Sequence, residues 1–328
     1  MKFVMAIFVV GLHVNVFTEE KTGALTESFF NCAVPFFFTA SGFLLENKIL
    51  KNKEPEFLVL KSNMLRNLKI YLLWMLLYLP YSLNQYISDG VVWYKDLVYY
   101  LRNLLLIGQT VYSWPLWYML ALVVSVFIIF LLRKKNIDLQ RIWVIGLFLM
   151  ILGQFINLSK NSEISWISTI CKAELFIYGT RNGVFEGLAL VSTGMLIRKY
   201  EDKLSNGIIL GCVCFAIGIA GSYYTKSPTG IFQPISGCAI FLITISLSLP
   251  NKNIFRKLRA DSMIIYLAHM FIVVLLFIDF PKFTGYKLNS KSVYLMIALV
   301  FLISWFLAEF INYLKTKSGF TWIKYFLA

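Results

Sequence analysis

Residues 1–17 read MKFVMAIFVVGLHVNVF, an apolar run interrupted at depth by one histidine, His13. Similar apolar runs recur along the whole chain, without the alternation of polar and apolar residues that is typical of barrel strands. In lipid, a spanning segment must satisfy its own backbone hydrogen bonds, and a helix does so within one segment. The sequence therefore predicts an all-α, polytopic membrane helix bundle.

Composition supports the same class, because hydrophobic residues make up 59% of the 328 positions and charged residues only 15%. A soluble protein could not hide so much apolar surface. We predict about ten transmembrane helices in a single domain, residues 1–328, each long enough or nearly long enough to cross about 30 Å of hydrocarbon. They run Phe3–Phe17, Phe29–Leu45, Leu68–Ile87, Trp114–Leu132, Arg141–Asn157, Asn182–Ile197, Gly207–Tyr223, Ile231–Leu249, Asp261–Phe280 and Ser292–Leu314. Two shorter apolar stretches, 97–107 and 166–178, are expected to be interfacial or re-entrant.

The basic residues indicate the orientation. About two thirds of the 31 Lys and Arg residues fall in alternate loops together with the two chain ends, and such loops face the cytoplasm. We therefore expect both termini to be cytoplasmic. In a membrane protein, the net charge of +14 favours contact with anionic lipid rather than with nucleic acid.

The residue inventory argues against several kinds of site. The five cysteines are unclustered, which is poor support for disulfides or zinc, and the chain has no nucleotide-binding glycine fingerprint. We expect no metal. Ser41 and Gly42 are expected to allow close helix packing rather than nucleophilic attack, because no nearby base is evident to activate the serine.

The chain has two histidines, His13 and His269, and both lie within apolar runs. An ionisable group at membrane depth usually serves chemistry, transport or a buried pairing. Lys2 precedes His13 by eleven residues, so both side chains project from one helix face about 16 Å apart. This spacing suits a substrate with an anionic head and a long thin arm, such as an acyl coenzyme A. The alternative is a snorkelling lysine with a histidine that hydrogen-bonds a neighbouring helix.

With these residues the chain resembles the integral membrane acyltransferases called acyltransferase family 3, and the resemblance runs along its whole length. Each motif is loose by itself, but their order along ten spans is fairly specific. The matching features are Lys2 with His13, VPFFFTASGFLL at Val34–Leu45, Arg66 and Lys69 in MLRNLKIYLLW, WPLWYMLAL at Trp114–Leu122, TRNGVFEGL at Thr180–Leu188, and IIYLAH at Ile264–His269.

The resemblance implies transfer of an acyl group, and we expect an acetyl group. The donor would be acyl-CoA (acetyl-CoA) on the cytoplasmic side, and the acceptor a hydroxyl of a cell-envelope polysaccharide or of its lipid-linked precursor. It also implies that activity depends on His13. An imidazole with a reference pKa of about 6.5 is an effective base near neutrality; alternatively, His13 carries the acyl group transiently.

We expect basic residues at the inner side, Lys2, Arg66 and Lys69, to bind the phosphates of the donor. The family often has Arg at the position of Lys2. An ammonium group offers a point charge rather than a planar fork, so bidentate phosphate binding is not expected there.

The sixth predicted span begins with the family motif that contains Arg181 and Asn182, which we expect to bind the acceptor on the outer side. Glu186 is one turn further in and is expected to orient them. The alternative is an arginine that anchors a helix end at the interface.

In the ninth predicted span, Ser262, Tyr266 and His269 share a helix face. His269 either lines the cavity of His13, together with Tyr266, or makes a structural hydrogen bond. Asp261 is expected to be the N-cap of this helix.

A transporter or exporter of a glycan or a small amino acid is the alternative function. Similar membrane modules are implicated in glycan export, and the chain also resembles the membrane part that is fused to serine racemases. In a transporter, the same histidine and arginine would form a substrate or proton site and no ester would be made. Either function is expected in a multi-pass protein of the bacterial plasma membrane.

Overall fold

The computed structural model describes residues 1–90, 93–203, 206–225, 230–247 and 252–327, and all regular elements in these ranges are helices. This confirms the predicted all-α class. The α-helices are α1 (Lys2–Phe17), α2 (Ala24–Asn31), α3 (Ala33–Lys51), α4 (Glu56–Asp89), α5 (Trp93–Arg102), α6 (Trp117–Lys134), α7 (Leu139–Ser159), α8 (Ser165–Ile177), α9 (Leu188–Lys199), α10 (Gly207–Thr225), α11 (Phe232–Ser246), α12 (Asn253–Val274), α13 (Phe280–Thr284), α14 (Val293–Leu314) and α15 (Lys324–Leu327).

In the described part of the chain, six helical segments are long and apolar enough to cross a membrane. They are Ala24–Lys51, Trp114–Lys134, Leu139–Ser159, Gly207–Thr225, Asn253–Thr284 and Val293–Leu314. Helices α1 and α11 are apolar but shorter. The molecule is therefore a polytopic membrane protein, whereas the total of about ten spans and the cytoplasmic location of both termini stay predictions. The predicted end of the eighth span, Leu249, lies outside the described residues.

Two helices begin well before the predicted spans. Helix α4 starts at Glu56 rather than Leu68, and α12 starts at Asn253 rather than Asp261. Hydropathy locates only the part of a helix that is in lipid, and Lys and Arg are good helix formers that extend the helix beyond it. The prediction of Asp261 as an N-cap is therefore wrong: it lies inside α12, is fully buried, and accepts a 2.7 Å hydrogen bond from Nδ2 of Asn312 on α14.

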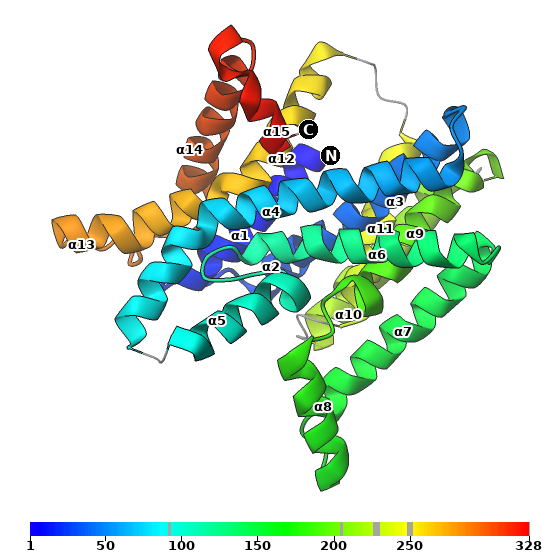
Figure 1. Cartoon of the computed structure of the whole chain (residues 1–328), viewed down its shortest axis with the longest axis horizontal. Helices are drawn as coiled ribbons and strands as arrows, with labels where there is room; N and C mark the ends of the chain where they lie inside the picture. Colours follow the sequence, from blue (N-terminus) through cyan, green and yellow to red (C-terminus); the bar gives the residue numbers. More distant parts are fainter. Residues whose placement is uncertain (91–92, 204–205, 226–229, 248–251, 328) are drawn as a thin grey trace.

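Helix α1 lies inside the bundle, where it packs against α2, α3, α12 and α14 (Figure 1). It is apolar around its whole circumference, as is typical of a helix enclosed by other helices or lipid. Its buried residues are Met5, Ala6, Val9, Val10, Gly11 and Val14. The two chain ends meet at one place, since Lys2 and Leu327 line the same cavity.

Helices α3 and α9 pack closely because each has a glycine where the other approaches. A Cβ atom on Gly42 would lie 1.9 Å from the backbone oxygen of Val191, and one on Gly194 would lie 1.9 Å from that of Thr39. The predicted packing role of Gly42 is confirmed. This contact holds α3 in place, and α3 supplies part of the wall of the cavity that Lys2 and Leu327 line.

Candidate functional site

A cavity of about 610 Å³ lies between α1, α3, α4, α6 and α12, and its wall is strongly basic. The lining includes six cationic side chains, Lys2, Lys48, Arg66, Arg256, Arg259 and Lys315, and no aspartate or glutamate from the described residues. None of the six forms a salt bridge with a described carboxylate. Unpaired cations on a largely apolar wall attract anions strongly, because the low dielectric of the wall focuses their field.

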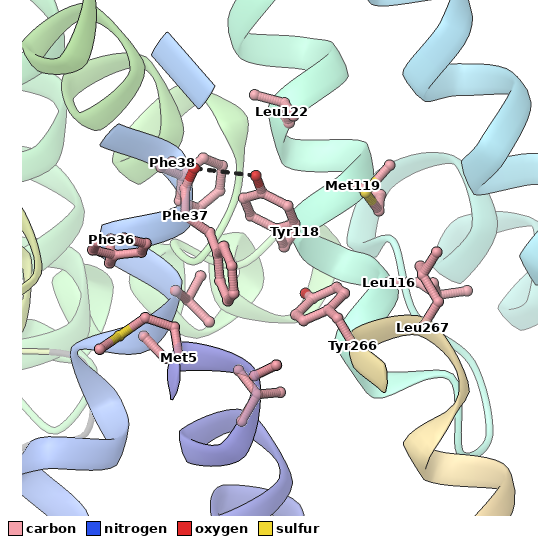
Figure 2. Packing of buried hydrophobic residues seen from close by; sticks show 14 of the residues in the cluster. Met5, Phe36, Phe37, Phe38, Leu116, Tyr118, Met119, Leu122, Tyr266 and Leu267 are labelled. Carbon is pink, nitrogen blue, oxygen red and sulfur yellow. Dashed lines mark hydrogen bonds between the residues drawn. The ribbon is translucent and has the colours of Figure 1, made fainter. Parts of the chain in front are cut away.

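Three aromatic rings line the same cavity where it extends into the bundle: Phe37 of α3, Tyr118 of α6 and Tyr266 of α12 (Figure 2). The centroid of Tyr266 lies 5.6 Å from that of Phe37 and 5.7 Å from that of Tyr118. These rings, which we call the aromatic wall, come from three different helices.

Hydrogen bonds hold both tyrosines of the aromatic wall. The hydroxyl of Tyr118 lies 2.8 Å from that of Ser41 and 3.3 Å from the backbone oxygen of Phe37. Tyr266 donates to the backbone oxygen of Pro115 at 2.5 Å. A buried tyrosine normally has such a partner. Each ring is therefore fixed, and its hydroxyl must leave its partner if the ring is to move.

The two histidines form a pair beyond the aromatic wall. Their ring centroids are 5.2 Å apart, and the ring of Trp114 lies 5.9 Å from that of His13. His269 is one helical turn further along α12 than Tyr266, and His13 is about 16 Å along α1 from Lys2. The residues that line the cavity include Lys2 and Tyr266 but neither histidine. The pair therefore does not line the cavity, and His269 lies one helical turn from Tyr266, which does.

The environments of the two rings differ. His269 is fully buried, and its Nδ1 atom lies 3.0 Å from the backbone oxygen of Ile265. Its Nε2 atom is buried without a hydrogen-bond partner among the described residues. His13 is partly exposed. A buried polar atom without a partner is uncommon in native proteins and calls for an explanation.

The predicted donor-binding residues separate into two groups. Lys2 and Arg66 both line the basic cavity. Lys69 does not, because its Nζ atom lies 4.1 Å above the ring of Tyr325 near the C-terminal end of the chain. The remaining cations of the cavity were not predicted to bind the donor; in the sequence they indicate only the orientation of the chain in the membrane.

The sequence spacing of two of these cations could have indicated that they line the cavity. Arg256 and Arg259 are spaced at i and i+3, and Ser262 and Tyr266 continue the same helix face into the cavity. The predicted start of the helix at Asp261 leaves both arginines outside this face, whereas α12 begins at Asn253 and includes them. Hydropathy alone could not have corrected that boundary.

The predicted acceptor-binding residues lie together near the start of α6. The guanidinium of Arg181 is exposed and lies 4.7 Å above the ring of Trp117. Glu186 is half-buried and lines a small pocket with Arg181, although no salt bridge joins these two described residues. Arg181 therefore contacts a residue next to the aromatic wall, because Trp117 directly precedes Tyr118.

Asn182 has a local structural role. Its Oδ1 atom accepts hydrogen bonds from the amides of Val184 and Phe185 at 2.8 and 3.0 Å, and its Nδ2 atom donates to the backbone oxygen of Gly179 at 2.5 Å. It therefore caps the helical turn Gly183–Gly187 that carries Glu186. Asparagine is among the preferred residues for this position.

The described residues contain no group of three or more His, Cys, Asp or Glu side chains that is arranged to hold a metal ion.

Comparison with known proteins identifies one family and two distant relatives. A family profile described as an acyltransferase domain matches residues 1–309. An amino-acid racemase of Enterococcus faecalis is 24% identical over 312 residues, which cover 89% of this chain and 42% of that protein. A serine/alanine racemase of Enterococcus gallinarum is 28% identical over 211 residues, 62% of this chain and 29% of that protein. The chain thus spans less than half the length of these relatives. No solved structure matches.

Proposed function

The chain belongs to acyltransferase family 3, and we propose that it transfers an acetyl group from acetyl-CoA, on the cytoplasmic side of a bacterial plasma membrane, to a hydroxyl of a cell-envelope glycan or its lipid-linked precursor. The observation that carries this proposal is the basic cavity of about 610 Å³, whose lining includes Tyr266, one helical turn from His269 of the histidine pair.

The charge of the cavity fits this donor. Coenzyme A carries a pyrophosphate and a 3′-phosphate, and the six unpaired cations of the cavity match several phosphate charges. Two of them are arginines on successive turns of α12, Arg256 and Arg259, whose planar groups suit bidentate phosphate binding. The uncharged arm of the donor then extends away from the cations along the apolar lining toward Tyr266.

The chemistry requires the thioester to pass the aromatic wall and reach His13. A hydroxyl oxygen of the acceptor attacks the thioester carbonyl, the carbon–sulfur bond breaks, and the hydroxyl proton passes through His13 to the leaving sulfur. If His13 carries the acyl group instead, its nitrogen attacks the thioester and the coenzyme A thiolate leaves. The acceptor hydroxyl then attacks the acyl-imidazole, the carbon–nitrogen bond breaks, and the hydroxyl proton passes to the thiolate. Both routes need a neutral imidazole, because only a nitrogen with a free lone pair can take a proton or attack a carbonyl.

The acceptor approaches from the opposite side. Arg181 is exposed above Trp117, and Glu186 is within the next helical turn, so the two offer a donor and an acceptor of hydrogen bonds to a sugar or a phosphate. Asn182 supports this cluster through the cap that it makes. On this proposal, donor and acceptor meet near the start of α6, where Trp114 lies beside His13, Trp117 lies under Arg181 and Tyr118 lines the cavity.

A transporter of a small amino acid is the second candidate, because both distant relatives are named as amino-acid racemases. One experiment separates the two functions. The protein is reconstituted in membranes of the native cell that lack their own copy and is supplied with radiolabelled acetyl-CoA. We expect alkali-labile acetyl esters to form and free coenzyme A to be released. Movement of unmodified amino acid into vesicles without loss of acetyl-CoA would instead support transport.

The cavity arginines provide a test of the donor site. We expect Arg66→Ala and Arg259→Ala each to raise the KM for acetyl-CoA about 10- to 100-fold, because a hydrogen bond to a charged group contributes about 1.5–3 kcal/mol. The rate at saturating donor should change little, since neither residue is near His13. Lys61→Ala is the matched control, because Lys61 is an exposed cation on the same helix as Arg66 and does not line the cavity. An unchanged KM in both arginine variants would contradict the proposed donor site.

A further inference from the structure

The hydrogen bond of His269 determines which of its nitrogens carries the proton. Nδ1 lies 3.0 Å from the backbone oxygen of Ile265, and a carbonyl oxygen can only accept, so Nδ1 must be the donor. A neutral imidazole has one N–H group, and Nε2 is therefore left with a lone pair. Among the described side chains, this atom is fully buried and has no partner.

The ring of His13 lies beside that of His269, with 5.2 Å between the two centroids and a tilt of 33° between the ring planes. The described residues show no hydrogen bond between the two rings, but ring nitrogens turned toward each other at this centroid separation would come within hydrogen-bond reach. No hydrogen bond to the His13 side chain is found in the described part of the chain, so the position of its ring proton is not determined by another group. One ring thus has an unused acceptor, and its neighbour has an unassigned donor.

We propose that His269 is a positioning residue whose Nε2 accepts the ring N–H of His13 and so fixes the tautomer in which the other nitrogen of His13 presents its lone pair to the substrates. This proposal rests on the acyl transfer proposed above. It applies to both routes, because a base and an acyl carrier each need a lone pair on the nitrogen that faces the substrates.

The protons balance in each step. In the resting state, the N–H of His13 points at Nε2 of His269. When His13 takes the proton of the acceptor hydroxyl, it becomes an imidazolium that still donates to Nε2, so the new charge is stabilised without a second proton transfer. The proton taken up then passes to the sulfur of coenzyme A, and the resting tautomer is restored.

A purely structural histidine would not explain the unpaired nitrogen. Leaving a buried acceptor without a partner is unfavourable, and an aromatic residue of similar size would fill the same space without that cost. The hydrogen bond to Ile265 is made within α12 and connects no other helix. Packing therefore does not explain why a nitrogen atom occupies the buried position of Nε2, whereas a role in orienting His13 does.

Two substitutions separate the two nitrogens of His269. The amide of asparagine reaches about as far as Nδ1 and keeps a donor for Ile265, but it leaves nothing at the place of Nε2. The amide of glutamine reaches about as far as Nε2 and returns an oxygen acceptor toward His13. We expect His269→Asn to lower kcat about 100-fold with an unchanged KM for acetyl-CoA, on the scale of a lost base function, and His269→Gln to recover at least a tenth of the wild-type kcat.

The assay uses radiolabelled acetyl-CoA and membranes of the native cell, with the amount of folded protein measured by size-exclusion of a fluorescent fusion. Equal and full activity of both variants would overturn the positioning role. Equal loss in both, with a raised KM, would also overturn it, since that result indicates a packing role. Absence of transfer by the wild-type protein would be a failure of the proposed function itself and would remove this inference with it.

Discussion

Replacing His13 with alanine is expected to abolish ester formation while leaving the protein folded in the membrane. In the proposed reaction His13 is the base or the acyl carrier, and loss of a general base typically costs about 10²- to 10⁴-fold in rate. If His13 carries the acyl group, the loss should be complete. The measurement is transfer of radiolabelled acetyl groups to alkali-labile esters in membranes of the native cell.

Donor binding provides the control for this variant. His13 does not line the basic cavity, so we expect coenzyme A to raise the thermal unfolding temperature of His13→Ala and of the wild type by the same amount. Ester formation at the wild-type rate would reject His13 as the reacting group. A double variant, His13→Ala with His269→Asn, should be no slower than His13→Ala alone, because a positioning residue has no effect once the group it positions is gone.

The sequence predicted Lys2 and His13, the two ends of the proposed donor path, but not the aromatic wall. Lys2 and His13 were related by helical spacing alone, which holds for any straight helix. The aromatic wall involves α3, α6 and α12, and its rings come from a chain in which aromatic residues make up 17% of all positions. Which of these rings meet depends on contacts between distant segments, and no local pattern distinguishes Tyr118 and Tyr266 from the rest.

The extent of the basic cavity was also beyond the sequence analysis. Lys48, Arg256 and Lys315 were expected in cytoplasmic loops, where basic residues are common for reasons of orientation. They line one cavity because α3, α12 and the end of α14 converge at the place where α1 begins. Lys69, by contrast, was assigned to the donor from its motif, and the packing of Tyr325 against it could not be foreseen from α4 alone.

The second large effect concerns the crossing of α3 and α9. We expect Gly194→Ala to destabilise the protein by about 3 kcal/mol, near the upper end of the usual cost of overpacking. The new Cβ would lie 1.9 Å from the backbone oxygen of Thr39 and 2.8 Å from the amide nitrogen of Phe43. Neither backbone atom can rotate away as a side chain can, so the two helices must separate. The unfolding temperature in detergent measures this loss, and Gly23→Ala, which has nothing within 4 Å of its Cβ, is the matched control.

Gly42→Ala should have a similar effect, because its Cβ would meet the backbone oxygen of Val191 in the same crossing. A separation of α3 from α9 that accommodates one methyl group also makes room for the other. The double variant should therefore lose less stability than the sum of the two single variants. Full additivity would mean that each glycine acts on a separate contact.

Because α3 carries Phe37 of the aromatic wall, the separation of α3 from α9 in these variants should widen that wall. We expect the variants that remain folded to hydrolyse acetyl-CoA without an acceptor.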